Sequence, residues 1–106
     1  MSNWQDKSDF EINKAVAGLH LNCGFRFDRM NQIHKGVDIH STEKGIFNPC
    51  NNPSDAWPII IDNKISIFPT GLKSDIWRAE GYFKDCQRDK NPLRAAMIVY
   101  LELNNA

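Results

Sequence analysis

The sequence predicts an α+β fold, in which three helices pack with a small, mostly antiparallel sheet and the C-terminal helix is central. Three observations lead to this prediction: a capping box precedes a helical pattern near the N-terminus, two Asn-Pro pairs each precede an apolar segment, and short runs of alternating apolar residues lie between the helices. The 106 residues can bury one hydrophobic core, so we expect a single domain spanning residues 1–106.

The first helix is predicted over about residues 9–19. Residues 8–11 read Ser-Asp-Phe-Glu, which matches the S-x-x-E capping box that satisfies free N–H groups at a helix start. Ile12, Val16 and Leu19 follow at helical spacing. One face of this helix is therefore expected to pack against the core.

The second helix is predicted to begin at Asn52-Pro53. Asparagine is a good N-cap, proline fits the first helical position, and Asp55 favours the positive end of the helix. Pro58 should stop this helix after one or two turns, because an internal proline removes a backbone hydrogen bond. Trp57 is expected to be buried as a core anchor.

The third helix is predicted from Pro92, capped by Asn91, to about Leu103. Apart from Arg94, Glu102 and the tail it is apolar on nearly every face. A helix with so little polar surface is buried on more than one side, so we expect it to be the centre of the core.

Strands are predicted where apolar residues alternate or form short runs between turn signals. The predicted strands are 24–27, 37–39, 46–47, 64–68 and 75–80 with 82–83. Residues 69–71, Pro-Thr-Gly, are a turn signal that makes a hairpin of the last two. Residues 84–90 are rich in charge and are predicted to be a loop.

Composition and charge exclude several classes of protein. The 13 basic and 13 acidic residues cancel, so the chain lacks the positive field of a general nucleic-acid binder, and nucleic acid is an unlikely partner. No apolar run approaches the roughly 20 residues that span a bilayer, and no signal peptide precedes the first helix. We therefore expect a cytoplasmic protein with no membrane partner, in which Cys23, Cys50 and Cys86 are reduced thiols.

Both Asn-Pro stretches also indicate a family. The residues that carry the resemblance are Asn-Pro-Cys-Asn-Asn-Pro-Ser-Asp-Ala-Trp-Pro-Ile-Ile at 48–60, Asn-Pro-Leu-Arg-Ala-Ala-Met-Ile-Val-Tyr-Leu at 91–101, and Asp-Phe-Glu-Ile-Asn-Lys at 9–14. They resemble the NinX family of small proteins from lambda-like bacteriophages, a domain of unknown function. The resemblance covers most of the chain and is weakest over 22–43. It implies a phage accessory protein expressed in the bacterial cytoplasm, and it provides no catalytic residues.

Metal and nucleophilic sites are disfavoured. His20, Cys23, His34 and His40 lie close in sequence, but zinc ligands are usually paired more tightly, so surface histidines are the better interpretation. Cys50 has no adjacent basic residue that would lower its pKa, and we expect it to be a small buried side chain. Carboxylate pairs such as Asp62 and Glu80 occur in any domain. We expect no metal, no cofactor and no enzymatic activity.

The candidate ligand-binding residues lie at the two Asn-Pro helix starts. A helix start offers free N–H groups and a positive dipole end, and aromatic rings and a guanidinium nearby would suit a nucleotide-like anion. The candidates are Asn51, Asn52, Trp57, Trp77, Asn91 and Arg94. The competing interpretation is structural, with the asparagines as caps and Arg94 paired to an acid, for which Asp55 is the best guess.

The leading functional hypothesis is a phage accessory protein that binds, without catalysis, a small anionic nucleotide-like molecule of the host, with counter-defence as one purpose and a homo-oligomer as the expected state. The alternative is an adaptor or inhibitor of a host protein with no small-molecule site. A pocket that holds Trp57, Trp77 and Arg94 favours the first hypothesis. A flat exposed apolar patch favours the second.

Overall fold

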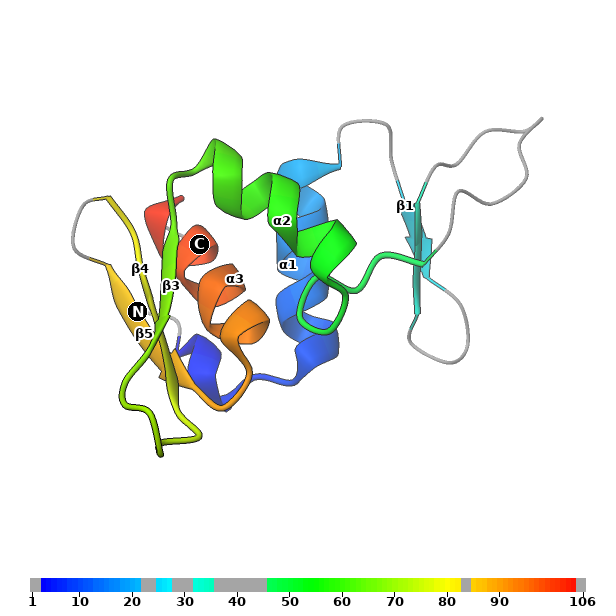
Figure 1. Cartoon of the computed structure of the whole chain (residues 1–106). Coiled ribbons are helices and arrows are strands. Elements are labelled where there is room, and N and C mark those ends of the chain that lie inside the picture. The colour runs from blue at the N-terminus through cyan, green and yellow to red at the C-terminus, as the bar shows by residue number, and fades with distance from the viewer. Residues whose placement is uncertain (1–2, 22–24, 28–31, 36–45, 83–84, 105–106) are drawn as a thin grey trace.

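The computed structural model describes residues 3–21, 25–27, 32–35, 46–82 and 85–104. The α+β prediction is confirmed. Helix α3 (Pro92–Leu103) contacts a three-stranded antiparallel sheet and also contacts helices α1 (Asp9–His20) and α2 (Pro53–Asp62). Figure 1 shows α3 between the sheet on one side and the other two helices on the other, so the C-terminal helix is central, as predicted. No helix in the described part of the chain is long and apolar enough to span a membrane.

Helix α1 follows a short 3₁₀ helix, η1 (Trp4–Asp6), and begins where the capping box places it. The Ser8 side chain accepts a hydrogen bond from the Glu11 N–H at 3.2 Å, which satisfies a free donor of the first turn. The residues of α1 that are buried in the core are Ile12, Asn13, Val16 and Ala17. The buried asparagine among them is the one polar exception on an otherwise apolar face.

Helix α2 continues beyond Pro58, so the prediction of one or two turns is too short. The missing N–H of a proline costs about 3 kcal/mol in a helix interior. Burial of Ile59 and Ile60, which are 0% and 4% exposed, offsets this cost because each buried side chain contributes about 1.5–3 kcal/mol. The helix ends instead at Asp62, with Asn63 as its C-cap. Lys64 follows with a left-handed φ of 56°, which allows the Ile65 N–H to bond the Ile60 carbonyl at 3.0 Å.

The three-stranded sheet has the order β3 (Ser66–Pro69), β4 (Trp77–Glu80), β5 (Cys86–Asp89). The hairpin of the first two strands is as predicted. The charged loop predicted over 84–90 is wrong, because residues 86–89 pair antiparallel with β4. Cys-Gln-Arg-Asp has no apolar alternation, so pairing with a neighbouring strand determines this structure and the local pattern does not.

A second, two-stranded sheet pairs β1 (Phe25–Phe27) with β2 (Ile33–Lys35). Strand β1 falls within the predicted segment 24–27. Strand β2 was not predicted, and the strand predicted at 37–39 lies outside the described residues. At 46–47 the chain forms a single bridge, between Ile46 and His34, in place of a strand. His34 is buried, so the expectation of a surface histidine is wrong there.

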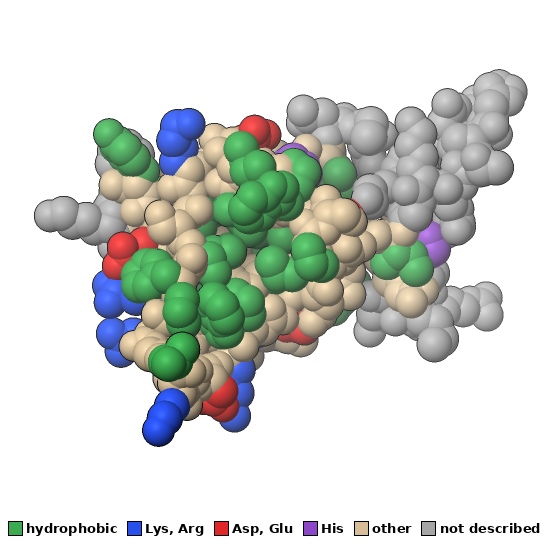
Figure 2. All heavy atoms as spheres, in the orientation of Figure 1, with side chains coloured by type: hydrophobic (Ala, Val, Ile, Leu, Met, Phe, Trp, Pro, Cys, Tyr) green, Lys and Arg blue, Asp and Glu red, His purple; other side chains and the backbone are tan. Residues whose placement is uncertain are grey.

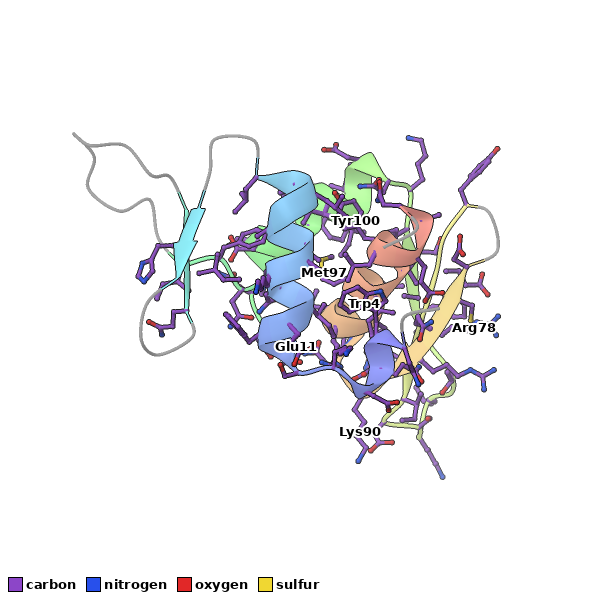
Figure 3. All side chains as sticks on the ribbon, turned by 180° about the vertical axis from the view of Figure 1, so that it is seen from behind. Trp4, Glu11, Arg78, Lys90, Met97 and Tyr100 are labelled. Atoms are coloured by element: carbon purple, nitrogen blue, oxygen red, sulfur yellow. The ribbon has the colours of Figure 1, made fainter. Side chains whose placement is uncertain are left out.

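The core is built around α3, in which all residues from Ala95 to Leu101 are buried. Figure 3 shows Met97 and Tyr100 of this helix directed into the molecule between α1 and the sheet. The sheet lies very close to α3 at Gly81, where an added Cβ would be 3.1 Å from Cγ1 of Val99. A larger residue at the end of β4 would require the side chains of Val99 and Leu103 to shift by a few tenths of an ångström.

A polar pair also joins α3 to the sheet, because Nε2 of Gln87 donates a hydrogen bond to Oε1 of Glu102. Burial raises the pKa of the Glu102 carboxyl, the hydrogen bond from Gln87 lowers it in part, and the charge of Asp85 raises it again. The net direction is upward. Glu102 therefore takes up its proton more readily in the folded protein than an exposed glutamate would.

We expect Glu102→Gln to raise the free energy of unfolding at neutral pH and to bring no gain at acidic pH. A carboxyl whose pKa is higher in the folded state loses stability as the pH rises through that range, because ionisation is then opposed only when the chain is folded. Glutamine keeps an acceptor for Gln87 and removes the charge. Urea unfolding of both proteins at the two pH values measures the difference. A variant less stable than the wild type at neutral pH contradicts the prediction.

Candidate functional site

The two Asn-Pro helix starts lie side by side. The Asn91 side chain, at the start of α3, donates to the Cys50 carbonyl at 2.5 Å and to the Asn51 side-chain oxygen at 3.3 Å. Asn51 in turn donates to Oδ2 of Asp9, in the first turn of α1, at 3.1 Å. This polar cluster, which we call the asparagine junction, thus joins the N-terminal ends of all three α-helices.

Behind the junction lies a buried amide network. The side chain of Asn13, only 5% exposed, donates to Oδ1 of Asn48 at 2.7 Å and accepts from the Cys50 N–H at 3.1 Å. Asp55, 4% exposed, accepts from the Asn48 N–H at 2.9 Å. These bonds hold the loop before α2 against α1.

The N–H groups at both helix starts are already used within the chain. The side chain of Asn52 accepts from Ser54, and that of Asn91 accepts from Leu93 and Arg94. The N–H of Asp55 bonds to the Asn52 carbonyl at 3.1 Å. Pro53 and Pro92, at the first helical positions, have no N–H to offer. The prediction that these asparagines bind an anion stays a prediction, but an anion there would have to displace existing bonds.

Arg94 is paired internally, and its predicted partner is wrong. Its Nε donates to Asp89 at 3.1 Å and its guanidinium also donates to Asp9 at 2.5 Å, whereas Asp55 belongs to the amide network. A second terminal nitrogen donates to the carbonyls of Gln5 and Lys7 at 3.1 and 2.6 Å. The side chain is 13% exposed. Arg94 therefore fixes the segment between η1 and α1, and the two carboxylates compensate its unfavourable position at a helix start.

Cys50 is fully buried beneath the junction, as predicted. Burial raises the pKa of its thiol to about 12, the charge of Asp9 raises it further, and Arg94 acts in the opposite direction. A thiol with this pKa is almost entirely protonated at neutral pH, so its environment does not activate it as a nucleophile. Of the zinc candidates, Cys23 and His40 lie outside the described residues, and the described residues hold no cluster of three or more metal-ligating side chains.

The two tryptophans of the predicted site differ in position. Trp57 is 58% exposed, so the expectation that it anchors the core is wrong. Helix α2 directs Ala56, Ile59 and Ile60 inward, and at about 100° per residue Trp57 then faces outward. Trp77 is half-buried at the start of β4, opposite Asp89. It thus lies near the strand that carries one partner of Arg94.

An open groove of about 770 Å³ runs along the outer face of α1 beside η1. Its lining residues are Trp4, Lys7, Phe10, Glu11, Lys14, Ala15 and Gly18. Trp4 and Phe10 are half-buried and pack against the core, while Lys7 and Lys14 are exposed. Figure 3 shows Trp4 of η1 beside α1, the helix on which Glu11 borders the same groove. The groove therefore combines aromatic surface with exposed ammonium groups.

A comparison with protein families supports the resemblance that the two Asn-Pro stretches carry. A family model described as "Bacteriophage P22, NinX" matches residues 3–103. The chain belongs to this family. The match extends from η1 to the end of α3 and so includes every residue of the asparagine junction and of the groove in this NinX protein. No curated protein matches the chain.

The groove was not found from the NinX sequence, although a signal for it is present. Glu11, Lys14 and Gly18 recur every three or four residues, which places them on one face of α1, and Lys7 lies just before the helix, so this face is polar. Such a face usually lies free in water. Only the return of η1 against α1, held by Arg94, brings Trp4 beside these residues and makes a groove of the face.

Proposed function

We propose that this NinX-family phage protein is a non-enzymatic binding protein that captures a small anionic, nucleotide-like molecule of the host cytoplasm in the α1 groove. The observation that supports this proposal is the pairing of half-buried Trp4 and Phe10 with exposed Lys7 and Lys14 around one open groove. Its volume, about 770 Å³, lies within the range of about 300–1,000 Å³ that is typical of small-molecule sites.

The lining indicates the chemistry of the ligand. A planar aromatic body would stack on Trp4 or Phe10, and base–aromatic stacking contributes about 1–3 kcal/mol. An anionic group would be attracted by Lys7 and Lys14, which outnumber the single acid, Glu11. The Lys7–Glu11 pair is weak, at 3.9 Å with both side chains about half exposed, so an anion can compete for this lysine.

Arg94 supports the groove indirectly. By holding the carbonyls of Gln5 and Lys7 it fixes the segment that connects Trp4 to α1. Its role is therefore to position the groove wall, in place of the direct contact with an anion that the sequence suggested. The alternative function, an adaptor for a host protein, would use the exposed apolar side chains Trp57 and Ile61 of α2.

The test uses adenosine monophosphate as the probe, with adenosine and inorganic phosphate as its separate halves, in isothermal titrations of the full chain. We expect the nucleotide to bind more tightly than either half. Trp4→Leu should weaken nucleotide binding about tenfold, because it keeps apolar volume but removes a stacking surface. Lys14→Gln should also weaken binding of the nucleotide and leave binding of adenosine nearly unchanged.

Matched controls carry the same changes outside the groove. Trp57→Leu alters an exposed tryptophan on α2, and Lys73→Gln alters an exposed lysine in the turn between β3 and β4, so both should bind as the wild type does. Native mass spectrometry of the protein purified from a bacterial host reports any ligand that it retains. Absence of both nucleotide binding and a retained small molecule would overturn the proposal, as would binding that Trp4→Leu leaves unchanged.

A further inference from the structure

The position of η1 depends on its attachments, because none of its three residues is buried. On one side Arg94 of α3 donates a hydrogen bond to the Gln5 carbonyl at 3.1 Å. On the other side the Gln5 side chain donates to β5, to Oε1 of Gln87 at 2.7 Å and to the Arg88 carbonyl at 3.3 Å. The segment that carries Trp4 is therefore held between α3 and β5.

The bond between Gln5 and Gln87 belongs to a chain of three side chains. Nε2 of Gln87 donates to Oε1 of Glu102, near the C-terminal end of α3, while Oε1 of Gln87 accepts from Gln5. This polar chain runs from α3 across β5 to η1. It connects the far end of the central helix with the wall of the α1 groove.

The acceptors at both ends determine the direction of every bond in the polar chain. An ionised carboxylate only accepts hydrogen bonds, so the amide nitrogen of Gln87 must face Glu102 and its oxygen must face away. A backbone carbonyl also only accepts, so the amide nitrogen of Gln5 must face Arg88 and, beside it, the oxygen of Gln87. The polar chain is therefore specific in its donors and acceptors as well as in its shape.

We propose that Gln87 is a positioning residue for the α1 groove, because through Gln5 it holds the Trp4 wall where a planar ligand stacks. This inference rests on the proposed function, since the position of the wall matters only if a ligand binds there. Gln87 does not line the groove, so it acts on a ligand only through η1. Arg94 holds the backbone of the same segment, and Gln87 holds its side chain in addition.

The first experiment exchanges the two outer groups of the polar chain. Gln87→Glu places one carboxylate against another, and the repulsion moves the side chain at position 87 away from Gln5. Glu102→Gln alone keeps an acceptor for Gln87. In the double variant the new amide at position 102 donates to the new carboxylate at position 87, which again accepts from Gln5. The double variant should therefore restore what Gln87→Glu removes.

The readout is the affinity for adenosine, measured by isothermal titration of the full chain. Adenosine is uncharged, so the added carboxylate does not repel it directly. We expect Gln87→Glu to weaken adenosine binding about threefold, because a solvent-exposed hydrogen bond contributes little. Glu102→Gln and the double variant should bind as the wild type does. The matched control is Gln32→Glu, the same substitution just before β2, which should also leave the affinity unchanged.

The same comparison separates the groove from the apolar face of α2. Figure 2 shows hydrophobic side chains gathered on the face of the molecule formed by α2 and β3, and Trp57 of α2 is 58% exposed. Adenosine that stacked on this face would not respond to Gln87→Glu, because the polar chain joins η1, β5 and α3.

The second experiment needs no ligand. The N–H groups of Asp6 and Lys7 bond to the carbonyls of Asn3 and Trp4 at 3.2 and 3.1 Å, so their hydrogen exchange reports on η1. We expect faster exchange at both amides in Gln87→Glu, relative to the amides of α3, and exchange as in the wild type in the double variant.

The outcomes distinguish this inference from the proposed function. If the wild type binds neither adenosine nor adenosine monophosphate, both proposals fail. If the wild type binds them and Gln87→Glu binds adenosine equally well, only the positioning role of Gln87 is overturned. Unchanged exchange at Asp6 and Lys7, or a double variant that restores neither binding nor exchange, overturns it as well.

Discussion

Asn13→Leu is expected to lower the free energy of unfolding by about 2–3 kcal/mol, although leucine has the same branching and number of side-chain heavy atoms as asparagine and the position faces the core. The loss arises because the buried Cys50 N–H loses its acceptor at 3.1 Å. Oδ1 of the half-buried Asn48 loses its donor at 2.7 Å and keeps only the donor of Asn51 at 3.1 Å. Each unsatisfied buried group costs about 1–3 kcal/mol.

The control for this prediction is Asn104→Leu. Asn104 also uses its amide, donating to the Tyr100 carbonyl at 2.8 Å, but it lies exposed at the end of α3. Water can replace that bond, so a loss below about 1 kcal/mol is expected. Urea unfolding followed by circular dichroism compares the two variants. If Asn13→Leu were as stable as the wild type, the buried amide network would contribute nothing to the fold.

The helices could be predicted because their signals are local. Ser8 and Glu11 define the start of α1, and an asparagine cap with a proline after it marks the start of α2 and of α3. The central position of α3 follows from its own composition, since seven consecutive residues from Ala95 to Leu101 are buried. None of these inferences requires knowledge of distant contacts.

The incorrect predictions concern features that depend on residues distant in sequence, or on which face of a helix turns toward the core. Strand β5 exists because β4 pairs with it. The exposure of Trp57 depends on which face of α2 meets α3, and Ile59 and Ile60 decide this in favour of the other face. A tryptophan in an apolar segment is usually buried, so the pattern alone favoured the wrong outcome.

The candidate site shows the same division. The sequence brought the two Asn-Pro starts together only through a guessed pair between Arg94 and Asp55. The starts do lie side by side, but through Asn91, which donates to Cys50 and Asn51. The carboxylate partners of Arg94 were not predicted, because Asp9 is 85 residues away in sequence and nothing local relates the two residues. The groove escaped prediction for the same reason, since it depends on how η1 folds back against α1.

Arg94→Leu is expected to be the other strongly destabilising change, with a loss of about 3 kcal/mol in the free energy of unfolding. The substitution leaves Asp9 and Asp89 without their common cation and leaves the carbonyls of Gln5 and Lys7 without a donor. Removal of one partner of a buried ion pair costs about 3–5 kcal/mol, and the partial exposure of Asp9 places the expected loss at the lower end. Arg94→Lys should recover only part of it, because an ammonium cannot reproduce the fork that reaches all these acceptors.

Double-mutant cycles identify the partners of Arg94. Asp89→Asn combined with Arg94→Leu should cost clearly less than the sum of the single changes, because the uncompensated carboxylate is then absent. Asp55→Asn combined with Arg94→Leu should be additive, since Asp55 accepts from the Asn48 N–H. Coupling to Asp55 in place of Asp89 would restore the pairing that the sequence suggested and would contradict the structure.

Because Arg94 also fixes the segment that carries Trp4, the Arg94→Leu variant should bind the nucleotide more weakly even under conditions in which it is fully folded.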